Sequence, residues 1–344
     1  MADLSSAERA VLRVCRSGLE VTELQRQVLA ALRGVLTIDA AALGTVDPET
    51  LMFTGIHNED PLTALSQRFL DNELDGRDVN TFTELTRAPG HVRSLDTATR
   101  GERMVSPRYR DLMRPAGLGD ELRAALVVGG HCWGYLCLHR EDGALGFTTA
   151  EAGLVRRLAP HIAQALRQAV LLPRATADGP HRPGVVLLDE QLELVASTPD
   201  ADALLPLIGH GSTRLPLPVG VYSVAAALAT SDRPPSIRVR AATGGWLDLH
   251  ASRLQSSSDA RIAVVLEPAQ PQSTLGVLLA AYGLTARELD VARLVLRGEP
   301  TSVIARSLHI STHTVQDHLK SVFDKVGVRS RRDLVGRLLA GQTG

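Results

Sequence analysis

The first 170 residues alternate between two patterns of apolar positions. In residues 6–36, apolar side chains recur every three or four positions, the spacing of one face of an α-helix, and Gly18 predicts a break between two helices. Residues 38–46 and 51–56 are apolar segments on either side of a turn-forming Asp-Pro pair, which predicts two strands. A mixed fold of helices and strands is therefore expected here.

A hairpin and a long helix are predicted next. Residues 122–128 and 132–139 are apolar runs joined by a Gly-Gly pair, which predicts a β-hairpin. Thr148 and Glu151 have the spacing of a capping box, a sequence signature of a helix N-terminus. Apolar side chains then recur every four positions, so this helix is expected to bury one face.

Two proline-containing stretches, residues 173–183 and 268–274, have the composition of linkers. The segment between them predicts a hairpin, a short helix and three further strands, at residues 185–189, 192–196, 202–208, 237–241, 246–252 and 261–267. From residue 275 onward the pattern is helical. We therefore expect a multidomain protein, with α+β domains at residues 1–172 and 184–268 and an all-α domain at residues 275–344.

The C-terminal domain carries clear signals for helix ends. Thr285 and Glu288 form a second capping box, and the helix that they open ends before Gly298. A short helix is expected at residues 301–308. Ser311 and Gly327 are favourable residues at the start and end of a third helix, and Ser330 for the start of a fourth at residues 331–340. This order is a helix-turn-helix layout.

The third helix has an apolar face and an adjacent polar face at 100° per residue. The apolar face comprises Val315, Leu319, Val322, Phe323 and Val326. The polar face carries His313, Gln316, Asp317 and Lys320. Glutamine can bind adenine, aspartate can accept from cytosine, and lysine can donate to guanine or phosphate. The face suits the reading of base edges, and it also suits an ordinary solvated helix.

Motifs in the C-terminal domain resemble the DNA-binding domain of LuxR-type transcription factors. The residues that carry the resemblance are Leu284-Thr-Ala-Arg-Glu288, Gly298, Ile304-Ala305, Leu308, Ser311, Thr314-Val315, His318 and Lys325-Val-Gly-Val-Arg-Ser330. The resemblance implies a four-helix domain whose third helix enters the major groove. The residues that it directs toward bases are Gln316, Asp317, Lys320 and the adjacent His313. The residues that it places near phosphates are Thr312, Thr314, His318, Arg329, Ser330 and Arg331. It also implies a dimer contact through the last helix.

Two positions depart from the LuxR-type pattern. That family frequently has a basic residue where this chain has Gln316, and a neutral residue where it has Asp317. An acidic side chain facing DNA lowers electrostatic affinity. Asp317 therefore needs a compensating favourable interaction with a base or with a neighbouring arginine. Non-specific DNA binding is expected to be weaker than in a typical member.

The body of the chain resembles two sensor folds. Residues 20–170 resemble a GAF domain through residues 38–43 with the Asp-Pro turn, the predicted hairpin and Phe147-Thr-Thr-Ala-Glu151. That resemblance implies an antiparallel sheet that covers a small-molecule cavity, with a ligand that the sequence does not identify. Residues 184–268 resemble a PAS domain. Both lysines of the chain lie in the C-terminal domain, so the body lacks the lysine of a phosphoacceptor receiver domain.

Composition adds three points. The chain of 344 residues has 37 basic and 38 acidic side chains, but residues 275–344 hold ten basic and six acidic ones, a distribution typical of a nucleic-acid module on an acidic body. Aromatic residues make up only 3% of the chain, which argues against a stacking platform for single strands. No apolar run approaches the roughly 20 residues of a membrane helix, and no secretory signal is evident, so a cytoplasmic protein is expected.

Three cysteines form neither a disulfide framework nor a four-ligand zinc site. His131, Cys132, Cys137 and His139 share one predicted strand, where alternation places Cys132 on the face opposite the other three. They suit a soft metal or redox site, or a structural role for packed thiols and strand-end histidines. The structural interpretation is favoured, so no metal and no cofactor are expected.

Together these patterns predict a DNA-binding transcription regulator that is not an enzyme. It is expected to act as a homodimer on an inverted-repeat site, with RNA polymerase as a further partner, and to sense an unidentified small molecule. One alternative is a signal-independent regulator whose GAF-like region only forms dimers or binds a protein partner. A more remote alternative is an enzyme with a helical tail, but no nucleophile elbow, P-loop or metal-ligand spacing supports it.

Overall fold

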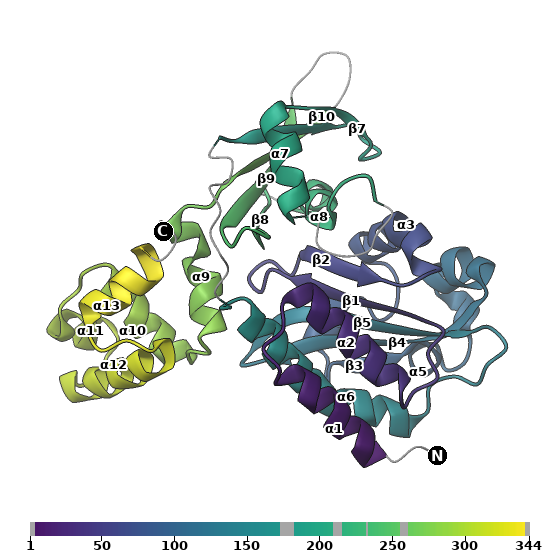
Figure 1. Cartoon of the computed structure of the whole chain (residues 1–344), viewed down its shortest axis with the longest axis horizontal. Helices are drawn as coiled ribbons and strands as arrows, with labels where there is room; N and C mark the ends of the chain where they lie inside the picture. Colours follow the sequence, from purple (N-terminus) through teal and green to yellow (C-terminus); the bar gives the residue numbers. More distant parts are fainter. Residues whose placement is uncertain (1–3, 173–181, 209–214, 232, 255–260, 341–344) are drawn as a thin grey trace. The chain divides into compact units, whose positions relative to one another are not determined.

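A computed structural model gives the fold of the chain and describes residues 4–172, 182–208, 215–231, 233–254 and 261–340 (Figure 1). The chain divides into two compact units, Met1–Pro268 and Ala269–Gly344. The first unit contains two five-stranded antiparallel sheets, and the second contains helices. The predicted fold class, α+β followed by all-α, is confirmed.

The first sheet has the strand order β2-β1-β5-β4-β3. Its strands are β1 (Ala40–Val46), β2 (Phe53–Asn58), β3 (Val92–Ser94), β4 (Leu118–Val128) and β5 (His131–Glu141). Gly129 and Gly130 join β4 to β5 with φ angles of 61° and 80°, a left-handed turn that glycine adopts without strain. Strand β4 begins four residues earlier than predicted, because Leu118 and Glu121 also pair with β5.

Helices cover both faces of this sheet (Figure 1). One face packs against α6 (Thr149–Ala169), which in turn contacts α1 (Leu4–Cys15) and α2 (Val21–Arg33). The other helical elements of this region are α3 (Leu62–Asp75), α4 (Phe82–Arg87), α5 (Leu95–Thr99), η1 (Arg103–Val105), η2 (Tyr109–Met113) and η3 (Arg114–Ala116). The predicted capping box opens α6, since Thr148 Oγ1 accepts from the amide of Glu151 and the Glu151 carboxylate accepts from the amide of Thr148.

The second sheet repeats the strand order of the first. Its order, β7-β6-β10-β9-β8, again places the second, first, fifth, fourth and third strands of the region side by side. The strands are β6 (Gly184–Leu188), β7 (Leu194–Ser197), β8 (Ser236–Arg240), β9 (Trp246–Leu254) and β10 (Arg261–Pro268), with helices α7 (Pro199–Ile208), α8 (Val219–Ala226) and η4 (Ala227–Ala229). The PAS resemblance of this region stays a prediction.

The two sheet-containing regions of the first unit are in contact. Helix α8, which the sequence pattern did not predict, packs against β2 and α3 as well as against the second sheet. Nearly all of its residues are buried, so it shows no polar periodicity along the chain. Arg238 on β8 donates to the buried carboxylate of Asp47 at 2.7 Å and also pairs with Glu49, both in the β1–β2 connection.

The second unit consists of successive short helices. They are α9 (Pro271–Ala281), α10 (Ala286–Leu296), α11 (Thr301–Ser307), α12 (Thr312–Val326), α13 (Arg331–Val335) and η5 (Gly336–Ala340). The prediction of a linker at residues 268–274 is wrong in its second half, because α9 begins at Pro271. Proline is well suited to the first turn of a helix, where its missing N–H has no intrahelical partner.

The other predicted linker, residues 173–183, lies almost wholly outside the described residues. Within the described part of the chain, none of the helices combines the length and the apolar character needed to cross a membrane.

Candidate DNA interface and ligand cavity

Helix α12 has one buried and one exposed face. Val315, Leu319, Val322 and Val326 are buried, whereas Phe323 is only partly so. The Oγ atom of Ser311 accepts from the amide of Thr314 at 3.0 Å, and Gly327 ends the helix at a φ of 76°. The side chains predicted to read bases are all exposed, namely His313, Gln316, Asp317 and Lys320. The sequence pattern thus placed both faces of the helix correctly.

Gln316, Lys320 and Arg329 line a shallow groove along α12 together with Phe323 and Val328. Asp317 lies outside this groove lining, and its carboxylate is 3.9 Å from Nε2 of His313, one turn away. A base or an arginine was expected to compensate the charge of Asp317, and the structure places a histidine beside it instead.

The residues predicted to lie near phosphates differ in their exposure and in the hydrogen bonds that they make within the protein. Thr312 and Arg329 are exposed. Ser330 Oγ accepts from the amide of Asp333 at 3.1 Å and caps α13, and the hydroxyl groups of Thr314 and Ser311 lie 2.9 Å apart. Arg331 donates to the carbonyl of Glu299 at 2.9 Å and to Oγ1 of Thr301 at 2.7 Å. His318 is half-buried.

A buried carboxylate ties α12 to α10. Glu288 accepts from Nζ of Lys325 and from Oγ of Ser321, each at 2.6 Å, and from the amide of Thr285 at 2.6 Å. Burial alone would raise the pKa of Glu288, but these donors outweigh it and lower the pKa to about 2. The ammonium group of Lys325 is therefore held against α10, and Lys320 lies exposed on α12.

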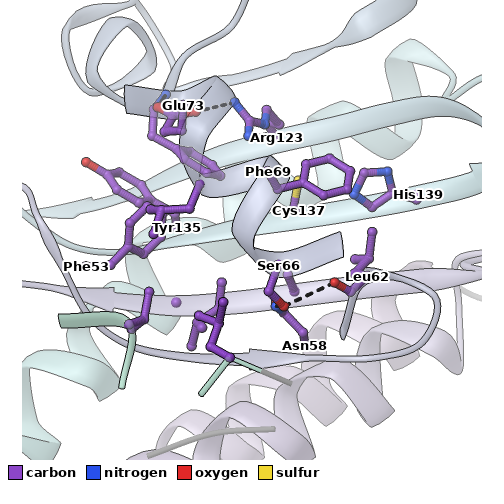
Figure 2. A pocket seen from close by; sticks show the side chains of 17 residues that line it. Phe53, Asn58, Leu62, Ser66, Phe69, Glu73, Arg123, Tyr135, Cys137 and His139 are labelled. Atoms are coloured by element: carbon purple, nitrogen blue, oxygen red, sulfur yellow. Dashed lines mark hydrogen bonds and ion pairs between the residues drawn. The ribbon is translucent and has the colours of Figure 1, made fainter. Parts of the chain in front are cut away.

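A cavity of about 60 Å³ lies over the first sheet in the other unit (Figure 2). Three of the chain's five phenylalanines line it, Phe53, Phe69 and Phe82, together with Tyr135. The rings of Phe82 and Tyr135 stack at 4.1 Å between centroids, and Phe53 meets Tyr135 edge to face at 5.4 Å. The aromatic side chains are few in this chain, but folding gathers these four around one space.

A network of buried charges borders the cavity. Glu121 on β4 accepts from Nε of Arg108 at 2.8 Å and from Nε of Arg123 at 3.1 Å. Arg123 also donates to Glu73 at 2.7 Å, an ion pair that Figure 2 shows at the edge of the cavity. Burial opposes ionisation of Glu121, but the two guanidinium groups outweigh burial and place its pKa well below the ordinary range. Arg108 has no exposed surface.

Comparison with known proteins bears on both regions. The model of the family described as bacterial regulatory proteins, luxR family, matches residues 283–338, and the GAF domain model matches residues 20–166. Over 56 residues the chain is 39% identical to the spore germination protein GerE of Bacillus subtilis, a match that covers 16% of this chain and 76% of GerE. The chain belongs to the LuxR family. The predicted LuxR-type and GAF-type regions are thereby confirmed.

Two further proteins are similar to this LuxR-family chain. The response regulator RamR of Streptomyces coelicolor is 36% identical over 115 residues, which cover 31% of this chain and 55% of RamR. The chain thus spans only about half the length of that relative. A crystal structure of Escherichia coli SdiA shares 13% identity with a TM-score of 0.38, over 99% of this chain and 98% of that one.

In this LuxR-family protein, Cys132 lies on a different face of β5 from the predicted one. In the register of β5 against β4, Leu126 faces Gly134 but Val127 faces Cys132, so Trp133 is the extra residue of a β-bulge. The bulge reverses the alternation, and Cys132 packs in the same apolar cluster as Tyr135 and Cys137. The prediction that Cys132 lies on the opposite face is therefore wrong.

The four residues weighed as a metal or redox site do not come together. His131 is at the hairpin end, where Nδ1 lies 3.1 Å from the carbonyl of Gly129. Among the described residues, the structure instead groups Cys137 and His139 with Glu121. Both Glu121 oxygens already bind guanidinium groups, and burial raises the pKa of the Cys137 thiol, so this group is poorly suited to a cation.

The charged and polar residues beside the cavity were not predicted from the sequence. Glu121 and Arg123 alternate with apolar residues on β4, and this pattern could have indicated one polar face of the strand. Arg108, Glu73 and Asn58 come from separate elements or loops, and no local signal joins them to that face.

Arg329 and Arg331 follow α12 in the chain, and their replacement by alanine should affect stability differently. Arg329→Ala removes an exposed side chain and should weaken binding to all DNA sequences alike, without changing the free energy of unfolding. Arg331→Ala also removes the bonds to Glu299 and Thr301, so it should destabilise the C-terminal unit by about 1–2 kcal/mol. Urea unfolding and DNA titration of both variants would check this, and equal stability of the two would contradict it.

Proposed function

We propose that this LuxR-family protein is a transcription regulator that binds an inverted-repeat DNA site as a homodimer and senses a small molecule through its GAF domain. The observation that carries the proposal is the exposed row of His313, Gln316, Asp317 and Lys320 on a helix anchored by its buried apolar face. These side chains offer donors and acceptors that match base edges in the major groove.

The homodimer follows from the symmetry of such sites. Two copies related by a two-fold axis present two α12 helices, and each half of an inverted repeat offers the same bases to one of them. We infer that α13 and η5 supply a dimer contact, as the LuxR-type resemblance implies. RNA polymerase is the expected further partner of a transcription regulator.

The cavity over the first sheet supports the sensing role. It is lined mainly by apolar and aromatic side chains, with a small number of polar groups, which is typical of small-molecule sites. A ligand there would act by binding one arrangement of the dimer better than another, which shifts their populations.

The test is enrichment of genomic DNA fragments by the purified full chain, beside the same experiment with residues 269–344 alone. We expect both to select one palindromic motif, and tighter selection by the full chain would indicate further dimer contacts in the first unit. The double variant Gln316→Ala, Lys320→Ala serves as the control that should lose the motif. Absence of enrichment from both proteins would contradict the proposal.

A further inference from the structure

The chemistry of the cavity indicates the class of its ligand. We propose that the cavity binds a small, neutral, largely apolar molecule of about one ring, which donates a hydrogen bond to Nδ1 of His139. This inference rests on the proposed sensing role of the GAF domain.

The size of the cavity limits the ligand. One water molecule needs roughly 10–15 Å³ of such space, and the cavity holds about 60 Å³. That is room for a few waters or for one small organic molecule. The walls formed by Phe53, Phe69, Phe82 and Tyr135 favour a flat apolar ring, because aromatic rings stack or meet edge to face at these separations.

Polar side chains around the cavity bind one another. Asn58 donates to Ser66 at 2.8 Å, Arg123 donates to Glu73 at 2.7 Å, and the Cys137 thiol donates to Glu121 at 2.8 Å (Figure 2 shows the first two pairs). These pairs leave an apolar ligand with little polar surface to desolvate.

His139 is not a member of these three hydrogen-bonded pairs. Its side chain is only 1% exposed, it lines the cavity beside Phe69, and Nδ1 has no hydrogen-bond partner among the described residues (Figure 2). Nε2 lies 3.7 Å from the Glu121 carboxylate, which favours the tautomer with its proton on Nε2 and leaves Nδ1 as an acceptor. A buried acceptor without a partner is costly, and a donor on the ligand would satisfy it.

The surrounding charges disfavour an ionic ligand. Three carboxylates, Glu73, Asp78 and Glu121, neighbour two guanidinium groups, so an anion would meet an excess of negative charge. A cation would compete with Arg123, whose guanidinium already lies 4.0 Å from the centroid of Phe82. Burial lowers the pKa of His139 to about 4, so its ring is neutral at pH 7.

The second sheet-containing region completes the wall. Leu215 and Val219, the latter at the start of α8, line the cavity together with residues of the first region. A larger side chain at position 219 should therefore occupy ligand space while His139 and the buried charges stay unchanged in sequence.

Calorimetric titration of the full chain with four benzene derivatives of similar size tests the proposal. Phenol is neutral and donates a hydrogen bond, fluorobenzene lacks the donor, benzoate is an anion and benzylammonium is a cation. We expect phenol to bind about tenfold tighter than fluorobenzene, the ratio that one net hydrogen bond provides, and tighter than both ions. His139→Phe keeps a ring but lacks the acceptor. The affinity of this variant for phenol should therefore fall to its affinity for fluorobenzene. Val219→Phe should weaken the binding of both neutral probes.

Five results would overturn the proposal: equal affinity of phenol and fluorobenzene for the native chain, tighter binding of either ion, absence of binding by both neutral probes, phenol binding unaffected by Val219→Phe, or an unchanged preference for phenol in folded His139→Phe. Fluorescence of Trp133 and Trp246, both in the first unit, reports whether each variant is folded. If His139→Phe does not fold, the native chain and Val219→Phe still decide whether the cavity binds a neutral donor ligand, and His139→Gln, which keeps a polar side chain, takes its place in testing the acceptor. The DNA enrichment described above is read separately, so failure of ligand binding and failure of DNA recognition are distinguishable.

Discussion

Replacing Glu121 by alanine should destabilise the first unit by about 3–5 kcal/mol, the range found when one partner of a buried ion pair is removed. Glu121 is fully buried and holds the guanidinium groups of Arg108 and Arg123 at 2.8 and 3.1 Å. Without it, Arg108 and Arg123, which are 0% and 3% exposed, keep fewer counter-charges. The loss in free energy of unfolding should therefore be among the larger ones caused by a single substitution.

Tryptophan fluorescence during urea unfolding of the full chain is a suitable measurement, because Trp133 and Trp246 both lie in the first unit. Asp111→Ala is the matched control. It removes a carboxylate paired with Arg110 at the surface, where an ion pair contributes about 0–1 kcal/mol. A loss below about 1 kcal/mol for Glu121→Ala would contradict the prediction.

The same residue predicts an acid dependence. The folded-state pKa of Glu121 lies below its ordinary value of 4.5, so ionisation of this group stabilises the fold above that pH. The contribution is lost as the pH falls below 4.5, because protonation then favours the unfolded chain. Glu121→Ala should flatten this part of the stability profile.

Gln316→Ala and Lys320→Ala should each weaken binding to the selected DNA motif by about 1–3 kcal/mol if these side chains read bases. Both side chains are exposed on α12, so their truncation should leave the free energy of unfolding nearly unchanged. They are one helical turn apart, and the effect of the double variant is expected to differ from the sum of the single effects because neighbouring sites couple.

Fluorescence anisotropy with the selected motif and with its single-base variants would measure these effects. Loss of discrimination at one base pair identifies a base contact. Arg329→Ala, the matched control, should weaken binding to all DNA sequences alike. Unchanged binding by both Gln316→Ala and Lys320→Ala would exclude this face of α12 as the reading surface.

Local signals sufficed for much of the C-terminal unit. The capping residues Thr285, Ser311 and Ser330 all accept from an amide three residues further along the chain, as their spacing predicts. The buried face of α12 follows from helical periodicity alone. The role of Arg331 was less predictable, because its partners Glu299 and Thr301 are some 30 residues away in the chain.

The two sheets show a limit of sequence patterns. Their strand orders are the same, yet the sequence shows no internal repeat, because strand order depends on which strands pair and not on which apolar residues fill them. The bulge at Trp133 had a similar effect on a smaller scale. One extra residue reversed the face of Cys132, and alternation along a single strand cannot reveal such a shift.

The sequence by itself determined the helix ends of the C-terminal unit, the exposed row on α12 and the LuxR-type and GAF-type character of the chain, because caps, periodicity and motifs act over a few residues. Only the tertiary structure decided the cavity and its charges. Phe53, Arg108, His139 and Val219 come from four distant segments, and their contacts depend on how the sheet, its covering helices and α8 pack together. The reason is physical: burial and long-range ion pairs arise from packing, which local patterns do not encode.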